Sequence, residues 1–355
     1  MLMPDEGERR RDLVVIGASA GGVETLRLVV AGLPPDLRAA ICIVLHIAPR
    51  SPSALGGILR RAGPLPCRPA RDGDVLEPGR ILVAPPDHHL VVEDRHVRLT
   101  AGPRENGHRP GIDVLFRSAA QTGDGRVIGV VLSGTRDDGT AGLAEIKSHG
   151  GVAVVQDPDD ALYDGMPVSA LAHVAVDAVV PAAQVAAVVT DMVNGASSPK
   201  PPEPDPGARP ASNPGHDSAH SSAVTTICPD CGGVLSERAA GEMMQWECRV
   251  GHRYSPQSLA DAQAEDVESA LWASIRALED RVKLLHRMSA RAEAQGQSRS
   301  SRSFRRRAEG ASRQAQVVRE ALTFAGATSL RPLGAEEPFG ERAADSLSGE
   351  QETAA

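Results

Sequence analysis

The feature that most constrains the fold is a regular alternation in the first half of the chain. From residue 12 to about residue 194, short aliphatic runs alternate with segments whose apolar residues recur at helical spacing. Aliphatic strands interleaved with helices predict a mainly parallel sheet, because parallel neighbours need a crossover between them and that crossover is usually a helix. We therefore expect an α/β fold with a doubly wound, mainly parallel sheet, helices on both faces and right-handed crossovers.

The expected strands share short runs of Val, Ile, Leu and Ala, and they lie at residues 13–16, 41–45, 81–83, 90–92, 97–99, 127–132, 152–155 and 178–180. The expected helices lie between several of these runs, at residues 22–31, 111–121, 140–149 and 182–192. The strands at 90–92 and 97–99 are separated by a short polar turn, which predicts an antiparallel hairpin. Aromatic residues make up 2% of the chain, so the core must be aliphatic.

The chain has 355 residues, which exceeds one typical domain, and its composition changes along its length. The expected segments, in chain order, are an α/β domain at 12–194, a disordered linker at 195–225, a zinc-binding module at 226–256, a helical segment at 257–326 and a disordered tail at 327–355. The linker is rich in Pro, Ser, Asp and Gly and nearly lacks aliphatic residues. The helical segment is rich in arginine, and we interpret it as a solvated helical pair. Its basic face would suit an acidic receptor bundle or RNA as partner, but a solvated face without a partner is the interpretation that we favour.

Charge and hydropathy exclude several classes of protein. The formal net charge of -8 argues against a nucleic-acid or anionic-membrane binder, because such surfaces need an excess of Lys and Arg. No apolar stretch reaches the roughly 20 residues that cross a bilayer, and residues 1–11 lack the long apolar region of a secretory signal. We expect a cytoplasmic protein with no membrane insertion and no nucleic-acid partner.

A Gly-rich turn follows the first expected strand. Residues 17–22 read GASAGG and lead into the first expected helix. One chemistry that uses such a turn is phosphate or dinucleotide binding, in which backbone amides approach a pyrophosphate. Another is a nucleophile elbow, because Gly17, Ser19 and Gly21 match the pattern that lifts a serine hydroxyl above the end of a sheet. The third interpretation is a tight turn with no chemical role.

Two further strand ends favour the nucleophile elbow. His46 follows the second strand, where a dinucleotide site would need an acidic residue instead, and no Walker lysine follows the glycines. An imidazole at this edge of the sheet is well placed to act as general base for Ser19. Asp138 lies in the loop after the strand at 127–132, where its carboxylate can accept the second imidazole N–H. Asp137 is its rival, and either aspartate can instead cap the following helix.

Taken together, these residues resemble the CheB-type protein-glutamate methylesterases of bacterial chemotaxis. The matching motifs occur in the same order and spacing, and they are GASAGG at 17–22, VLH at 44–46, RPGIDVLF at 109–116, DGTAG at 138–142 and GMP at 165–167. The resemblance implies that residues 12–194 are a methylesterase catalytic domain. It also implies that Ser19 is the nucleophile, that His46 is the base and that Asp138, rather than Asp137, orients the base.

The resemblance further implies a reaction and its partners. The family hydrolyses glutamyl methyl esters on the helical bundle of a chemoreceptor, often deamidates specific glutamines, and needs no cofactor for this catalysis. The expected partners are a methylated chemoreceptor or a related signalling protein, and a methyltransferase as counterpart. For the oxyanion, the resemblance implies backbone donors at Ala20, Gly21 and Thr135. It places Asp113 and Met166 at the substrate site.

The sequence departs from the family pattern at several positions. Typical members begin with a receiver domain, whereas only about 11 residues precede the first strand here, so we do not expect activation by aspartyl phosphorylation on this chain. The family more often has Met at the position of Thr135, and a backbone donor tolerates that change. The family often carries Ser at the position of Gly111.

A second site is expected in the Cys/His segment. Cys228 and Cys231 form one close pair, and Cys248 and His252 form another. Two such pairs joined by a hairpin suit tetrahedral zinc in a zinc-ribbon-like module, and in a reducing compartment a cysteine cluster favours metal over disulfide. Free cysteines are the alternative. Because four protein ligands leave no open position, the zinc would be structural, and we expect its removal to spare ester hydrolysis.

Two classes of function remain after these arguments. The first is a serine esterase that acts on a chemoreceptor or a related signalling protein. The second is a non-enzymatic sensory adaptor that retains the methylesterase fold and binds a partner through its C-terminal part. The presence of Ser19, His46 and Asp138 favours the enzyme, because an adaptor has no need of all three.

Overall fold

The computed structural model describes residues 11–49, 54–123, 125–195, 226–240 and 243–329. Most of the predicted linker at 195–225 and most of the predicted tail at 327–355 lie outside these ranges. The chain divides into two compact units, Met1–Gln263 and Ala264–Ala355. In the described ranges, no helix combines the length and the apolar composition needed to cross a bilayer.

The first unit is built on a seven-stranded sheet in which every pairing is parallel. In spatial order its strands are β3 (Cys67–Pro69), β4 (Ile81–Val83), β2 (Ala40–Leu45), β1 (Leu13–Ala18), β7 (Val127–Val131), β8 (Val152–Gln156) and β9 (Ala178–Val180). This order confirms the predicted doubly wound sheet. Because the chain leaves β1 toward β2 and returns on its other side at β7, the carboxyl ends of these three strands border a topological switch point, where open α/β sheets bind ligands.

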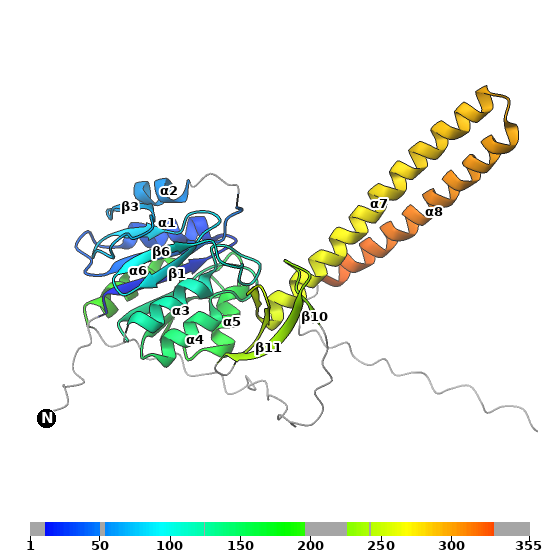
Figure 1. Cartoon of the computed structure of the whole chain (residues 1–355). Coiled ribbons are helices and arrows are strands. Elements are labelled where there is room, and N and C mark those ends of the chain that lie inside the picture. The colour runs from blue at the N-terminus through cyan, green and yellow to red at the C-terminus, as the bar shows by residue number, and fades with distance from the viewer. Residues whose placement is uncertain (1–10, 50–53, 124, 196–225, 241–242, 330–355) are drawn as a thin grey trace, which may run out of the picture. The chain divides into compact units, whose positions relative to one another are not determined.

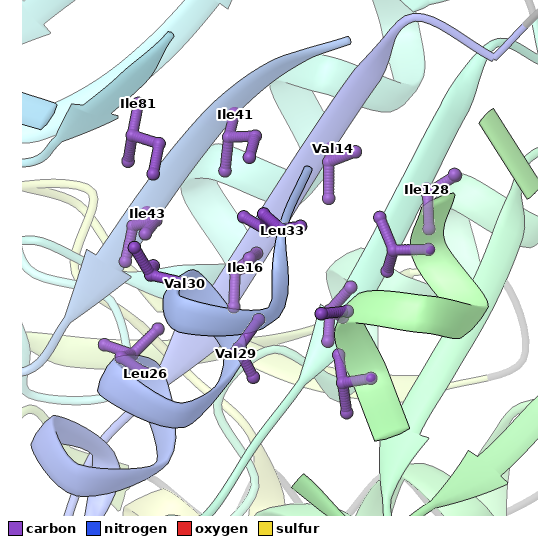
Figure 2. Packing of buried hydrophobic residues seen from close by; sticks show 14 of the residues in the cluster. Val14, Ile16, Leu26, Val29, Val30, Leu33, Ile41, Ile43, Ile81 and Ile128 are labelled. Atoms are coloured by element: carbon purple, nitrogen blue, oxygen red, sulfur yellow. The ribbon is translucent and has the colours of Figure 1, made fainter. Parts of the chain in front are cut away.

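Helices cover both faces of this sheet (Figure 1). One face carries α1 (Gly22–Gly32), α2 (Leu55–Ala62) and α6 (Ala182–Val193), and the other carries α3 (Ile112–Gly123), α4 (Thr140–Ser148) and α5 (Gly165–His173). Each face of the sheet has its own hydrophobic cluster, and strand β1 contributes to both. Val14 and Ile16 belong to the cluster under α1, α2 and α6, and Leu13 and Val15 belong to the cluster under α3, α4 and α5. Figure 2 shows the first cluster, in which α1 covers β1 and β2. Strands buried on both faces must be apolar along their whole length.

Within residues 12–194, the hairpin was predicted, and three other elements were not. Strands β5 (His89–Glu93) and β6 (His96–Thr100) pair antiparallel, as expected. Strand β3 was missed because it is short and contains Pro69, which an edge strand tolerates. Helix α2 was missed because Gly56 and Gly57 weaken its pattern. Helix α5 was missed because Pro167 reads as a breaker, although proline fits the first turn of a helix.

The Cys/His segment forms a small sheet of its own. It has four antiparallel strands, β10 (Thr226–Ile227), β11 (Val234–Ala240), β12 (Met243–Cys248) and β13 (Arg253–Tyr254). Helix α7 (Pro256–Ala294) begins directly after β13, and its first residues belong to the first unit. The predicted zinc-ribbon-like module is therefore a β-hairpin with a short strand added at each edge.

The predicted helical segment is two helices. Helix α8 (Ser298–Ser329) follows α7 after a turn in which Gly296 has a φ of 72°, a left-handed conformation that glycine adopts without strain. Ser289 bonds Ser301, and Glu279 pairs with Arg319, so the two helices run antiparallel. Helix α8 continues to Ser329, past the predicted end of the segment at 326.

Candidate active site

The three residues predicted to act in catalysis lie at the carboxyl ends of three adjacent strands. Ser19 follows β1, His46 follows β2, and Asp138 lies in the loop after β7. His46 Nδ1 is 3.1 Å from Ser19 Oγ, and His46 Nε2 is 2.7 Å from Asp138 Oδ2. The structure thus brings the three side chains into one hydrogen-bonded line.

The turn that carries Ser19 is fixed to the loop after β7. The Ser19 amide donates to the Ser133 carbonyl at 2.9 Å. Gly21, which precedes α1, has a φ of 74°, and glycine is the residue that accepts this left-handed conformation most readily. Gly134 has no room for a side chain, because a Cβ there would overlap Met166 Sδ and lie 2.8 Å from Ser19 Cβ. Met166 is fully buried behind Gly134, and its amide donates to the Gly134 carbonyl.

The hydrogen bonds of His46 determine its tautomer. An ionised carboxylate only accepts hydrogen bonds, so Asp138 Oδ2 takes the proton on His46 Nε2. The neutral imidazole then has a lone pair on Nδ1, and this nitrogen faces the Ser19 hydroxyl. His46 is therefore oriented to accept the proton of Ser19.

Asp138 is held by a dense set of donors. Its side chain is buried, and Oδ2 accepts the Ile112 amide at 2.8 Å in addition to His46. Its Oδ1 accepts the Asp113 amide at 3.2 Å and Asn106 Nδ2 at 3.0 Å. Burial opposes ionisation, but the hydrogen bond from His46 and the charge of that ring outweigh it and lower the pKa of Asp138. The carboxylate therefore stays charged next to the imidazole.

Asp113, predicted at the substrate site, lies beside Asp138 and supports its loop. Its Oδ1 accepts the amides of Gly139 at 3.0 Å and Gly142 at 2.7 Å, and its Oδ2 accepts Asn106 Nδ2 at 3.1 Å. The side chain is 2% exposed. Burial, followed by the charge of Asp138, raises the pKa of Asp113 well above its ordinary value. These contacts indicate a residue that builds the loop rather than one that touches a ligand.

Two residues near the triad were missed by sequence reasoning. The His108 ring stacks on His46 with a centroid separation of 3.7 Å and an interplanar angle of 12°. Burial, followed by the charge of His46, lowers the pKa of His108 to about 3, so it stays neutral beside the base. Asn106, described above, is the second. Both precede the motif at 109–116, and no periodicity or spacing marks them.

Backbone donors lie on both sides of Ser19. Within the described residues, the amides of Ala20, Gly21 and Thr135 donate to no protein acceptor, whereas those of Ser19 and Gly134 are paired. Ala20 and Gly21 lie directly before α1, where the helix N-terminus favours negative charge. These amides can stabilise an oxyanion that forms next to the serine.

The four predicted metal ligands also come together. Cys228 and Cys231 lie between β10 and β11. Cys248 is the last residue of β12, and His252 lies between β12 and β13. Their ligand atoms all lie within 4.8 Å of one another, with 3.7 Å between the Sγ atoms of Cys231 and Cys248. Zinc bonds of about 2.0–2.3 Å in a tetrahedron separate ligand atoms by roughly 3.3–3.8 Å, so the spacing suits a zinc ion. A disulfide would need about 2.05 Å.

The first part of the chain is similar to known proteins. A family model described as CheB methylesterase matches residues 14–189. A relative from Leptospira interrogans is named "Putative protein-glutamate methylesterase/protein-glutamine glutaminase". It is 39% identical over 167 residues, which cover 47% of this chain and 86% of the relative.

A longer relative and a solved structure are also similar to part of the chain. "Protein-glutamate methylesterase/protein-glutamine glutaminase 2" of Anaeromyxobacter dehalogenans is 42% identical over 172 residues, and the match spans 48% of this chain and 50% of the relative. The crystal structure of the Thermotoga maritima CheB methylesterase catalytic domain has 30% sequence identity and a TM-score of 0.49. That match covers 52% of this chain and 97% of the other.

Proposed function

Because the chain belongs to the CheB methylesterase family, we propose that Ser19, His46 and Asp138 hydrolyse glutamyl methyl esters and deamidate glutamine side chains. The observation that carries the proposal is the hydrogen-bonded line from Ser19 Oγ through His46 to Asp138. Esters and primary amides both present a carbonyl carbon and a leaving group that must receive a proton, so one nucleophile and one base serve both reactions.

In the first half-reaction, Ser19 Oγ attacks the ester carbonyl while His46 Nδ1 takes its proton. The imidazole becomes positively charged, and the ionised Asp138 stabilises it from the Nε2 side. The oxyanion of the tetrahedral intermediate accepts hydrogen bonds from the free amides around Ser19. When the intermediate collapses, the C–O bond to the methoxy group breaks, His46 returns the proton, and methanol leaves an acyl-enzyme on Ser19.

In the second half-reaction, His46 takes a proton from water, and the resulting hydroxide attacks the acyl carbon. The bond to Ser19 Oγ breaks, the serine recovers its proton from His46, and a glutamate carboxyl is released. With a glutamine substrate, ammonia leaves in the first step and the same acyl-enzyme forms. Both routes yield the same glutamate.

The substrate we propose is a methylated chemoreceptor or a related signalling protein in the cytoplasm. A glutamyl methyl ester on a protein must first be formed, so a methyltransferase acting on the same protein is the expected counterpart. A reducing compartment is also consistent with the free cysteines, since it would keep Cys228, Cys231 and Cys248 reduced and available to a metal.

Release of methanol tests this function. A chemoreceptor signalling domain carrying radiolabelled methyl esters is incubated with the full chain, with Ser19→Ala and with Ser148→Ala. Ser148 is an exposed serine whose hydroxyl bonds the Glu145 carbonyl and the adjacent His149, so its loss is a matched control. We expect release by the wild type and by Ser148→Ala and none by Ser19→Ala; equal release by a well-folded Ser19→Ala would rule out this mechanism.

We also propose that Cys228, Cys231, Cys248 and His252 hold a structural zinc ion. The apolar core of this segment is small, with Leu235, Tyr254 and Leu259 as its largest buried members besides the cysteines. So small a core rarely folds without a metal or a disulfide. The test is metal analysis of the purified chain and Co²⁺ titration of the apo form. We expect one zinc per chain and, after titration, the spectrum of cobalt bound by thiolates in a tetrahedron. If Cys231→Ser kept both the zinc and this spectrum, the proposed site would be wrong.

A further inference from the structure

The segment that follows the metal ligands contacts the catalytic domain next to Asp138. Immediately after His252, the Arg253 amide donates to the Arg104 carbonyl at 3.3 Å, and the Asn106 amide donates to the Arg253 carbonyl at 2.8 Å. Arg253 also forms an ion pair with Glu105, at 3.5 Å. Strand β13 is thereby joined by backbone hydrogen bonds to residues 104–106.

Asn106 links this contact to the catalytic carboxylate. Its Nδ2 donates to Asp138 Oδ1 at 3.0 Å and to Asp113 Oδ2 at 3.1 Å, while its Oδ1 accepts the Ser255 amide at 2.9 Å. The side chain is 4% exposed. An asparagine amide has one accepting and one donating end, so the Ser255 amide on Oδ1 determines that the NH₂ group faces the two carboxyls.

The same segment also holds the loop that carries Asp138. Ser258 Oγ, which is fully buried, donates to Asp137 Oδ1 at 2.6 Å. Asp261 forms an ion pair with Arg136 at 3.4 Å. The residues on the N-terminal side of Asp138 are therefore bound by side chains from the start of α7.

The charges around Asp138 make this contact matter for the reaction. Two buried carboxyls lie side by side, and the Asn106 NH₂ group is the side-chain donor that bridges Asp138 and Asp113. Without it, Asp138 and Asp113 would each lose a buried hydrogen-bond donor, which weakens and misaligns the bond from Asp138 to His46. The orientation of the base thus depends on the orientation of one amide.

We propose that Asn106 is a positioning residue for Asp138 and that the metal-bound Cys/His module, through the Ser255 amide, holds Asn106 in its productive orientation. Removal of the metal then slows ester hydrolysis without touching the triad. This inference rests on the proposed esterase function and the proposed zinc. It replaces the expectation that metal removal spares hydrolysis, because residue spacing alone gave no sign that residues 253–258 reach the loop of Asp138.

The test compares Asn106→Gly, Asn106→Asp and the control Asn194→Gly, each with and without a zinc chelator. Glycine keeps the left-handed backbone of Asn106, whose φ is 51°, and aspartate keeps the side-chain shape while it replaces the NH₂ group. Asn194 is an exposed asparagine at the end of α6. The readouts are kcat and KM for methyl-ester hydrolysis and the low-field proton resonance of His46 Nε2–H.

Loss of a hydrogen bond to a charged group is expected to lower kcat about tenfold to a hundredfold in both Asn106 variants, with KM nearly unchanged. The low-field resonance should broaden or shift in both variants. Chelation should produce the same changes in the wild type and in Asn194→Gly, but little further change in Asn106→Gly, because both treatments remove one interaction. Circular dichroism confirms that each variant is folded.

Two results would overturn the inference. One is a metal-free wild type with unchanged kcat and an unchanged low-field resonance. The other is a chelation effect of equal size in the wild type and in Asn106→Gly. If no form of the chain hydrolyses the ester, the esterase function fails instead, and the resonance of His46 still reports whether Asn106 and the metal position Asp138.

Discussion

His46 is constrained on three sides by residues that play different parts. Ser19 lies at one ring nitrogen, Asp138 at the other, and His108 covers one face of the ring. The first two contacts choose the tautomer, and the stacked ring limits rotation of the imidazole. Since His108 is held neutral by burial, it adds no positive charge next to the imidazolium that forms during acylation.

The role of Asp138 can be separated from that of its neighbour. Asp138→Asn should lower kcat for methyl-ester hydrolysis by about 10³- to 10⁴-fold, because the amide cannot hold the same tautomer or stabilise the imidazolium. Asp137→Asn is the matched control. Its partner Ser258 can still donate to the amide oxygen, so a small change is expected. Steady-state kinetics on the same substrate measures both variants. An equal loss of kcat in Asp138→Asn and Asp137→Asn would refute the assignment of Asp138 as the residue that orients His46.

His108 should make the protein sensitive to acid. Its pKa is about 3 in the folded chain and about 6.5 when unfolded, so between these values the unfolded state binds the extra proton. Titration of His108 therefore lowers the free energy of unfolding as the pH falls from about 6.5 toward 3. His108→Phe keeps an aromatic ring without the titration, so its free energy of unfolding should fall less steeply with acid than that of the wild type.

Urea denaturation at several pH values between 7 and 4 measures this difference. The unfolding free energy of His108→Phe minus that of the wild type should increase steadily as the pH is lowered. A difference that stays constant over this range would contradict the assignment of His108 as a buried neutral imidazole.

Residue types and their spacing were enough to propose the triad, but they could not predict the residues that support it. Ser19, His46 and Asp138 each follow an aliphatic run, so the edge of a parallel sheet was enough to bring them together. Asn106 and His108 come from an irregular loop, and their contacts depend on how that loop crosses the end of the sheet. Nothing in their local sequence indicates that position.

Among the structural elements, the turn after β1 and the start of α5 form one packed unit. Gly134 lies between Ser19 and Met166, and any side chain there would overlap both neighbours. Helix α5 therefore supports the turn that carries Ser19, although its sequence does not read as a helix. The buried strands were predictable because both of their faces are apolar, whereas α5 depends on packing that a proline-containing pattern conceals.

Gly134→Ala should damage both stability and activity. The added methyl group must displace Met166 or the Ser19 turn, and overpacking of this kind costs about 1–3 kcal/mol. Gly57→Ala is the control, because a Cβ there meets only the end of the Arg61 side chain and alanine favours a helix. Urea denaturation and kcat should show losses for Gly134→Ala and none for Gly57→Ala; an intact Gly134→Ala would show that the turn does not need this glycine.

For the whole molecule, the proposed catalytic residues and most of the helical hairpin fall in different units. All triad and metal ligands lie within Met1–Gln263, and the hairpin of α7 and α8 accounts for the described part of Ala264–Ala355. Composition predicts separate segments along the chain, and their bounds stay a prediction. It could not predict that residues just after the metal ligands bind the loop of Asp138, because that contact joins segments far apart in the chain.

Substitution of two adjacent leucines of α7 tests whether ester hydrolysis depends on the helical hairpin. Leu285 is 4% exposed and Leu284 is 57% exposed. Leu285→Ala should weaken the packing of α7 on α8 by about 2–3 kcal/mol, near the lower end for a buried leucine, whereas Leu284→Ala should have little effect. Amide hydrogen exchange in α8 should rise only in Leu285→Ala, with kcat unchanged in both. A fall in kcat for Leu285→Ala would show that the hairpin supports the active site.

The central claim is that Ser19 is a nucleophile activated by His46 and Asp138, and covalent labelling tests it most directly. The full chain is treated with a fluorophosphonate at neutral pH, and the modified residue is located by peptide mass spectrometry. We predict one adduct, on Ser19, that forms far more slowly in Asp138→Asn and is absent from Ser19→Ala. Labelling of a different serine, or equal labelling rates in the wild type and Asp138→Asn, would contradict the account.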